Sequence, residues 1–296
     1  MRPLIVAGNG IRLAGEQKRF REAIDSWQIP FVTTWTGADL IPTDHALNTG
    51  ILGMCGQGGA NKAVQECDYL MAIGTHLAIP HTTTLTDKFA PLAKIAVVNI
   101  DADQLANMNV RVDFPECIGI KELLDREGCL EVEGDISGWL ARCAALKLTN
   151  AIGNPGASSG INSYVFNDMM NRMLPPGTCI VIDGGGTALY TGFQSCFVKE
   201  GTRLVCSSSV SSMGSGLPEA VGACFANAKK LTTCLIGDGS FMLNIQELQT
   251  IVHHKLPIKI FVLNNNGYLS VRNTLDEFLG GRRHGVGASS TNDISW

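Results

Sequence analysis

Short apolar runs that alternate with helical patterns constrain the fold of this 296-residue chain more than any other feature. In the first half, strand-like runs occupy residues 4–7, 30–34, 69–73 and 94–99, and helical patterns occupy residues 17–27 and 60–66. Apolar runs of this length, separated by about ten to fifteen residues of helical pattern, are typical of parallel-sheet units. The sequence therefore predicts an α/β fold with a doubly wound parallel sheet in this half.

The same alternation restarts in the second half, after a break. Residues 149–160 (TNAIGNPGASSG) lack periodicity and concentrate Gly, Asn, Pro and Ser, which is typical of a linker. Strand-like runs then occupy residues 178–182, 204–206, 232–236 and 258–263, and helical patterns occupy residues 163–173, 217–228 and 245–255. We therefore predict two doubly wound parallel-sheet domains, a central α/β domain over residues 1–148 and a second domain over residues 161–296.

Two helical segments carry more detailed expectations. Residues 121–148 are acidic and helical in pattern, so we expect a solvated segment that closes the first domain. In the helix over residues 245–255, one apolar stripe is expected to carry Ile245, Leu248, Val252 and Leu256.

Composition and charge exclude several classes of partner. Charged residues make up 17% of the chain, the net charge is −4, and no basic run exceeds the pair Arg282-Arg283, so we expect neither nucleic acid nor an anionic membrane as a partner. The apolar run at the N-terminus is too short for a signal peptide or a membrane span. Ten cysteines occur without a CxxC spacing, which favours reduced thiols and a cytoplasmic location over a local zinc site.

Polar residues follow three strand-like runs of the second half. These runs end in Asp183-Gly-Gly-Gly, Gly-Asp238-Gly and Asn264-Asn265. The carboxyl ends of parallel strands meet at one edge of a sheet, and ligands bind at that edge. Because one helix and one strand separate Asp238 from Asn265, their strands are expected to be neighbours and their side-chain oxygens to converge.

This arrangement of oxygens suits a hard cation. Mg²⁺ takes carboxylate, amide and carbonyl oxygens and leaves room for phosphate oxygens. Gly237 and Gly239 allow close backbone approach, and helix N-termini after Gly239 and near Ser215 offer amide donors to an anion. The sequence therefore predicts a site for a magnesium diphosphate.

The motif as a whole resembles that of a known family. Gly237-Asp238-Gly239, a gap of twenty-four residues and Asn264-Asn265 resemble the signature of thiamine-diphosphate-dependent enzymes. The segment FMLNIQELQTIVHHKLPIKIFVLNN resembles the acetolactate synthase-like branch of that family. By this resemblance, the first half is similar to the family's central domain and the second half to its diphosphate-binding domain, with thiamine diphosphate and Mg²⁺ as cofactors.

The resemblance also implies roles for individual residues. The metal would be held by the side chains of Asp238 and Asn265 and by the Gly267 carbonyl. The diphosphate would contact Gly185, Gly186, Gly237, Gly239 and Ser240. In the segment SSMGSGLPEA, which resembles the loop that receives the aminopyrimidine, the cofactor would contact Ser211, Met213 and Gly214. Tyr268 would lie near the substrate.

For the activity, the resemblance implies decarboxylation of a 2-oxo acid with carboligation, in a homodimer or homotetramer. In the family, the activating glutamate lies in a pyrimidine-binding domain that precedes the central domain. This chain begins at the first central-domain strand and stops at Trp296, soon after the asparagine motif. We therefore expect the N-terminal pyrimidine-binding domain to be absent, the second domain to be C-terminally incomplete and no catalytic residue to lie in the chain.

The sequence is compatible with more than one role for this chain. The chain is expected to be inactive in isolation, and a separate subunit could supply the pyrimidine-binding domain. A non-catalytic cofactor-binding or scaffold homologue would also fit the sequence.

Two glycine-containing segments of the first half bear on the nucleotide cofactors FAD and NAD. The segment GMCGQG at residues 53–58 resembles a loop that contacts FAD in some relatives, but residues 74–80 lack the expected arginine, which disfavours FAD. Gly8-Asn9-Gly10 lacks the third glycine of a dinucleotide fingerprint, since Leu13 stands at that position. A turn is therefore favoured over an NAD site there.

Overall fold

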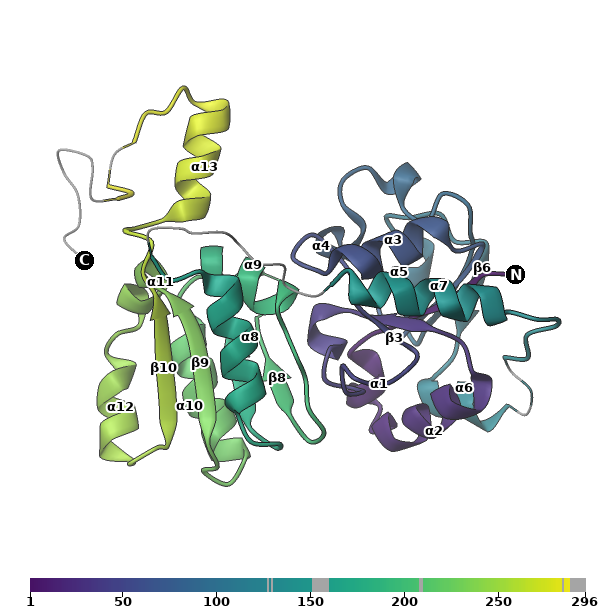
Figure 1. The fold of residues 1–296 in the computed structure, drawn as a ribbon, viewed down its shortest axis with the longest axis horizontal. Helices are drawn as coiled ribbons and strands as arrows, with labels where there is room; N and C mark the ends of the chain where they lie inside the picture. Colours follow the sequence, from purple (N-terminus) through teal and green to yellow (C-terminus); the bar gives the residue numbers. More distant parts are fainter. Residues whose placement is uncertain (127, 129, 151–159, 208–209, 284, 288–296) are drawn as a thin grey trace. The chain divides into compact units, whose positions relative to one another are not determined.

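The computed structural model describes residues 1–126, 128, 130–150, 160–207, 210–283 and 285–287. The chain forms two compact units (Figure 1). The first comprises Met1–Asn154 and Phe193–Lys199, and the second comprises Pro155–Gly192 and Glu200–Trp296. Each contains one all-parallel sheet, which confirms the predicted α/β fold class.

The first unit is a six-stranded sheet with helices between its strands. Its strands are β1 (Pro3–Ala7), β2 (Phe31–Thr33), β3 (Asn48–Ile51), β4 (Tyr69–Ile73), β5 (Lys94–Asn99) and β6 (Phe114–Cys117). Its α-helices are α1 (Gly10–Leu13), α2 (Gln17–Trp27), α3 (Gly58–Glu66), α4 (Ile79–Thr82), α5 (Ala102–Ala106), α6 (Ile120–Asp125) and α7 (Ser137–Leu148), and short 3₁₀ turns lie at Trp35–Gly37 and Thr86–Lys88. The strand order is β3-β2-β1-β4-β5-β6.

Both faces of this sheet are covered. Along β1, Leu4 and Val6 belong to one buried cluster, whereas Ile5 and Ala7 belong to another. Successive side chains of a strand point to opposite faces, so the alternation places one apolar core on each side of the sheet. Near-continuous apolar strands of this kind are the mark of a parallel sheet buried on both faces.

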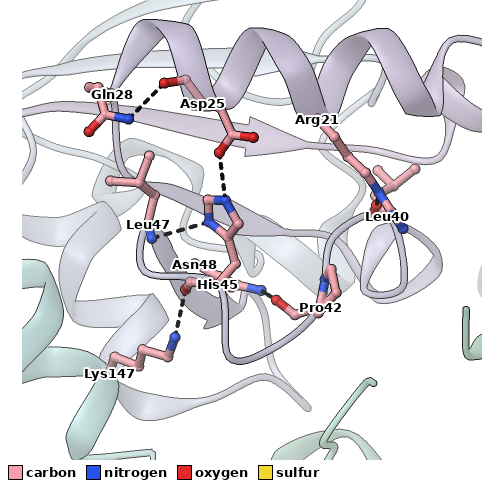
Figure 2. Close-up of polar contacts among 9 residues, drawn as sticks. All are labelled: Arg21, Asp25, Gln28, Leu40, Pro42, His45, Leu47, Asn48 and Lys147. Carbon is pink, nitrogen blue, oxygen red and sulfur yellow. Dashed lines mark hydrogen bonds and ion pairs between the residues drawn. The ribbon is translucent and has the colours of Figure 1, made fainter. Parts of the chain in front are cut away.

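A polar cluster fastens the connection between β2 and β3 (Figure 2). The Leu47 amide donates to Nδ1 of His45 at 3.3 Å, and the Nε2 of His45 lies 3.0 Å from a carboxylate oxygen of Asp25 on α2. Lys147 on α7 donates to the His45 carbonyl at 2.7 Å. Asp25 belongs to α2 and Lys147 to α7, so their contacts with His45 hold the loop between β2 and β3 against both helices.

The second unit contains a four-stranded sheet in the order β10-β9-β7-β8. Its strands are β7 (Cys179–Ile182), β8 (Arg203–Val205), β9 (Thr232–Gly237) and β10 (Ile258–Leu263). Its helices are α8 (Ser163–Met173), α9 (Gly186–Gln194), α10 (Gly216–Ala226), α11 (Asp238–Leu243), α12 (Glu247–His253) and α13 (Leu269–Phe278).

This sheet is also covered on both faces. Cys179 and Val181 of β7 share a buried cluster with Leu217 and Ala220 of α10. On the other face, the ring of Phe166 on α8 meets Phe261 of β10 edge to face, with centroids 5.3 Å apart. Figure 1 accordingly shows α8 and α10 on opposite sides of the strands.

Three features differ from the sequence pattern. Residues 121–148 form two helices, α6 and α7, and α7 buries Trp139 and Cys143 on the first sheet, so the segment is not merely solvated. Leu248 and Leu256 of the expected stripe pack with Ile251 in one buried cluster, whereas Val252 is 69% exposed and Ile245, which precedes α12, is 39% exposed. The helix was predicted over residues 245–255 from the spacing of its apolar residues, whereas α12 begins only at Glu247.

The third difference is an excursion of the chain. Residues 193–199, which comprise the end of α9 and the segment after it, belong to the first unit, where the Phe193 ring stacks on Trp35 with centroids 5.4 Å apart. The Thr43 amide donates to the Val198 carbonyl, and the Val198 amide donates to the Thr43 hydroxyl, each at 2.9 Å. Nothing in the periodicity of residues 161–296 marks this segment, because it is held by long-range pairing.

Candidate functional site

The connections of the second sheet create a crevice between β7 and β9. The chain leaves β7 through α9 to reach β8 on one side, and then returns across β7 to reach β9 on the other. At such a switch point the loops diverge, and ligands bind at the carboxyl ends of the two strands. A pocket lies there. Its walls are formed by Gly185, Gly186, Thr187, Met213, Gly237, Asp238, Gly239, Ser240, Asn265, Gly267, Tyr268, Leu269, Ser270 and Val271.

Asp238 is the anchor of this pocket. It begins α11 at the end of β9 and is 5% exposed. One carboxylate oxygen accepts the Gly239 amide at 2.8 Å, and the other accepts the amides of Asn265 at 3.2 Å and Gly267 at 2.8 Å. The carboxylate thereby joins the end of β9 to the loop after β10, as predicted from the crossover between them.

The Asn265 side chain is held from two directions. Its Nδ2 donates to the Thr187 hydroxyl on the first turn of α9 at 2.9 Å. Arg272 of α13 donates to the Asn265 carbonyl at 2.9 Å, and the same nitrogen lies 3.4 Å from the amide oxygen Oδ1. The amide oxygen therefore keeps acceptor capacity at the pocket, while its orientation is fixed by Thr187.

Close packing against glycine shapes the pocket wall. A Cβ placed on Gly239 would lie 2.6 Å from the ring of Tyr268, so the ring rests directly on the backbone after β9. Met213, which is 37% exposed, reaches the pocket from the loop before α10. The pocket therefore has an apolar side at Met213 and a polar side at Asp238 and Asn265.

A second buried carboxylate lies beneath this loop. Asp183 follows β7, is fully buried and accepts amides from Gly185, Gly214 and Gly216. Burial raises the pKa of Asp183, although hydrogen bonds from Ser240 and these amides lower it. The Gly216 amide at the start of α10, near the predicted anion site at Ser215, is thus taken by Asp183 and is not available to an external anion.

Ten of the twelve residues singled out from the sequence line this pocket. They are Gly185, Gly186, Met213, Gly237, Asp238, Gly239, Ser240, Asn265, Gly267 and Tyr268. Ser211 and Gly214 stand outside the lining, in the loop that carries Met213. Thr187 also lines the pocket but was not predicted from the sequence. Its position directly after the three glycines that follow Asp183 could have indicated that it lies at the site.

The donor atoms fit a magnesium diphosphate. Among the residues that the structure describes, no group of three or more His, Cys, Asp or Glu could hold a metal, so a cation here would need mixed oxygen ligands. Asp238 and Asn265 present a carboxylate and an amide oxygen to one pocket, which is the kind of donor set that Mg²⁺ accepts. The Gly267 carbonyl already accepts the Leu269 amide at 3.1 Å and keeps a second lone pair.

The two glycine loops of the first unit are packed against its own backbone. A Cβ on Gly8 would lie 2.3 Å from the Gly74 carbonyl oxygen, and the Gly10 amide donates to that carbonyl at 2.8 Å. The pair therefore lets the turn from β1 to α1 pack directly against the backbone that follows β4. In the loop raised for FAD, the Met54 amide donates to the Pro80 carbonyl at 2.8 Å, and a Cβ on Gly53 would meet the same oxygen at 2.6 Å. The backbone of this loop is therefore packed against α4.

Two further observations concern location. In the described ranges, none of the helices is both long enough and apolar enough to cross a bilayer. The nine cysteines in these ranges are free thiols.

Comparisons with known families match the two units separately. The family described as "Thiamine pyrophosphate enzyme, central domain" matches residues 1–126. The family described as "Thiamine pyrophosphate enzyme, C-terminal TPP binding domain" matches residues 178–295, which include the whole pocket.

Curated relatives extend the likeness over most of the chain. The acetolactate synthase large subunit of Lactococcus lactis is 29% identical over 95% of this chain and 49% of its own length. The large subunit of acetolactate synthase isozyme 2 from Escherichia coli is 28% identical over 92% of this chain and 48% of its own length. A probable large subunit from Methanocaldococcus jannaschii is 31% identical over 89% of this chain and 46% of its own length. The chain spans about half the length of these relatives.

Proposed function

Because the chain belongs to the thiamine pyrophosphate enzyme family and is acetolactate synthase-like, we propose that its second unit binds thiamine diphosphate together with Mg²⁺. The observation that carries this proposal is the convergence of Asp238 and Asn265 on one pocket at the switch point of the sheet. In the whole protein, the site would serve decarboxylation of a 2-oxo acid followed by carboligation. The curated relatives, named as acetolactate synthase large subunits, support that reaction class.

Different lining residues of the pocket would bind the metal and the diphosphate. Asp238, Asn265 and the Gly267 carbonyl would hold the metal, and Ser240 with the backbone of Gly185 and Gly186 would hold the diphosphate. The nine-residue helix α9 begins at Gly186, so its N-terminal amides favour a negative charge at the pocket. When bound, thiamine diphosphate supplies the electron sink that makes loss of carbon dioxide from a 2-oxo acid feasible.

The protein's own groups then orient and shield the site. Met213 offers an apolar contact to the bound cofactor, and the Tyr268 ring, resting on Gly239, covers one end of the pocket. Among the described lining residues, Asp238 is the only carboxylate, and backbone amides occupy both of its oxygens. We therefore propose that the 296-residue chain binds the cofactor without turning over substrate, and that the proton-removing group comes from another domain or subunit.

The same proposal covers assembly and location. A pyrimidine-binding domain would complete the site, and a homodimer or homotetramer is the expected state of the complete protein. The free thiols in the described ranges support a cytoplasmic location.

Calorimetry with matched variants tests the cofactor site. The chain is titrated with thiamine diphosphate in Mg²⁺, and the titration is repeated with Asp238→Ala and Asn265→Ala. Asp168→Asn, which removes a surface carboxylate paired with Arg172 on α8, is the control. We expect binding in the wild type and in Asp168→Asn, and loss of at least about tenfold in affinity in the two pocket variants.

Two outcomes would contradict the proposal. If Asp238→Ala binds as tightly as the wild type, Asp238 does not hold the metal. If the folded wild type binds no thiamine diphosphate, the chain is a scaffold homologue. An assay with pyruvate, thiamine diphosphate and Mg²⁺ tests the second part, since sustained carbon dioxide release from the chain alone would refute the assignment of proton removal to another domain.

A further inference from the structure

Among the described residues of the second unit, Asp183 is the buried carboxylate that accepts the most hydrogen bonds, and it does not line the pocket. Its side chain is fully buried at the end of β7. One oxygen accepts the amides of Gly214 at 3.0 Å and Gly216 at 2.9 Å, and the other accepts the Gly185 amide at 3.1 Å. Ser240 also hydrogen-bonds to the carboxyl group. Its partners belong to three separate segments, which follow β7, precede α10 and follow β9.

These segments are packed so closely that Asp183 has little freedom to move. A Cβ on Gly184 would lie 2.4 Å from the Ser211 carbonyl carbon, and one on Gly185 would lie 2.7 Å from the Ser240 hydroxyl. A Cβ on Gly216 would lie 2.9 Å from the Cβ of Asp183 itself. The backbone of the Met213 loop therefore sits directly on the turn that carries Asp183.

Asp183 also satisfies the start of a helix. Gly216 is the first residue of the eleven-residue helix α10, and its amide would otherwise have no partner within the helix. A carboxylate at this position is favourable because the N-terminus of a helix carries partial positive charge. With Asp183 in place, the first amide of α10 is taken, whereas Gly186 and Thr187 at the start of α9 line the pocket.

We propose that Asp183 is a positioning residue: it fixes the loop that presents Met213 and closes the N-terminus of α10, so that a bound diphosphate is confined to the side of the pocket formed by α9 and Ser240. This inference rests on the proposed function, since it concerns the same cofactor. It adds a residue that has no direct contact with the pocket. The ionised form suits the site, because the groups named above all donate hydrogen bonds to the carboxyl oxygens.

Substitution of Asp183 tests the inference in two independent ways. In Asp183→Asn, the side-chain NH₂ group faces backbone amides, so at least one amide among Gly185, Gly214 and Gly216 loses its acceptor. Hydrogen exchange in the absence of cofactor should therefore become faster at the loops carrying these glycines and stay unchanged at β9. Titration with thiamine diphosphate and Mg²⁺ should show a loss of about tenfold or more in affinity.

A second variant guards against misfolding. Gly216→Ala keeps the carboxylate but pushes against its Cβ, and Gly216 is not a lining residue. It should weaken cofactor binding in the same direction. Gly222→Ala on the same helix, where an added Cβ meets nothing within 4 Å, is the matched control and should bind as the wild type does.

The outcomes separate this inference from the proposed function. Unchanged exchange at the three glycines together with unchanged affinity in Asp183→Asn would overturn the positioning role. Faster exchange across the whole second unit, β9 included, would also overturn it, because Asp183 would then be a general stability residue. If the wild type binds no cofactor, the proposed function fails, and the positioning of the loop is decided by the exchange measurement.

Discussion

The side-chain amide of Asn265 donates to the Thr187 hydroxyl at 2.9 Å, and this bond joins the loop after β10 to the first turn of α9. It ties the NH₂ end of the amide to Thr187, while the amide oxygen lies 3.4 Å from a guanidinium nitrogen of Arg272. The bond therefore couples the proposed metal ligand to the helix expected to hold the diphosphate.

Removal of the Thr187 hydroxyl should weaken the metal site. In Thr187→Val the amide loses its acceptor, and a neutral hydrogen bond is worth about 0.5–1.5 kcal/mol. We expect the Mg²⁺ concentration needed for half-maximal binding of thiamine diphosphate to rise by about twofold to tenfold. Thr187→Ser retains the hydroxyl and should behave as the wild type. An equal shift in both variants would show that the hydroxyl is not the cause.

A methyl group on Gly239 should displace Tyr268. The added Cβ would lie 2.6 Å from the ring, so the ring or the backbone must move, and overpacking of this kind costs about 1–3 kcal/mol. We expect Gly239→Ala to lower the free energy of unfolding in urea by that amount. Gly222→Ala, with open space around its Cβ inside α10, should raise it by roughly 0.5–1 kcal/mol. Equal effects of the two substitutions would contradict the packing described for Tyr268.

The parts of the site that could be predicted from the sequence are those fixed by local order along the chain. Asp238 and Asn265 each follow a strand, and a single crossover makes those strands neighbours, so their convergence follows from topology. Asp183 is different. It too follows a strand, but its partners lie 31 and 33 residues further on, in a loop with no periodicity, so its role emerges only from packing.

The same distinction applies to the fold. The strands β1, β2, β4, β5 and β7 to β10 and the helices α2 and α8 follow from periodicity because their apolar positions repeat locally, whereas β3 and β6 were not predicted. The excursion of Phe193–Lys199 into the first unit does not, since it depends on Trp35 and Thr43 far earlier in the chain. On α12, Ile251 and Val252 are both apolar, and only the docking of the helix decides that Ile251 is the buried one.

Glu219 should make stability depend on pH. Burial raises the pKa of Glu219, the Ser215 side chain lowers it, and the charge of Asp183 raises it further. A carboxyl group whose folded pKa exceeds its unfolded pKa contributes stability below the unfolded value, and loses it as the pH rises through the folded value. The free energy of unfolding of the wild type should therefore fall relative to that of Glu219→Gln as the pH rises from the unfolded pKa of Glu219 through its raised folded pKa.

Asp113 provides a control of opposite sign for this titration. Its hydrogen bond from the Ile95 amide is the largest cause that lowers its pKa. The wild type should therefore lose stability relative to Asp113→Asn as the pH falls through the folded pKa of Asp113. Urea unfolding at several pH values measures both slopes, and a pH-independent difference for Glu219→Gln would contradict its burial.

Cysteine labelling should separate buried from exposed thiols. Burial raises the pKa of Cys55 and of Cys67 to about 12, whereas Cys117 on β6 is exposed. The thiolate is the reactive form, so iodoacetamide at neutral pH should modify Cys117 well before Cys55 or Cys67 in the native protein. Mass spectrometry of the digested protein measures the order, and rapid native labelling of Cys55 would contradict the packing of its loop.

Titration of the wild-type chain with thiamine diphosphate, once in Mg²⁺ and once after chelation, tests the central claim most directly. The account predicts saturable binding in Mg²⁺ that falls by at least about tenfold when the metal is removed, because Asp238 and Asn265 would contact the diphosphate through the cation. Binding of equal strength with and without Mg²⁺ would contradict it.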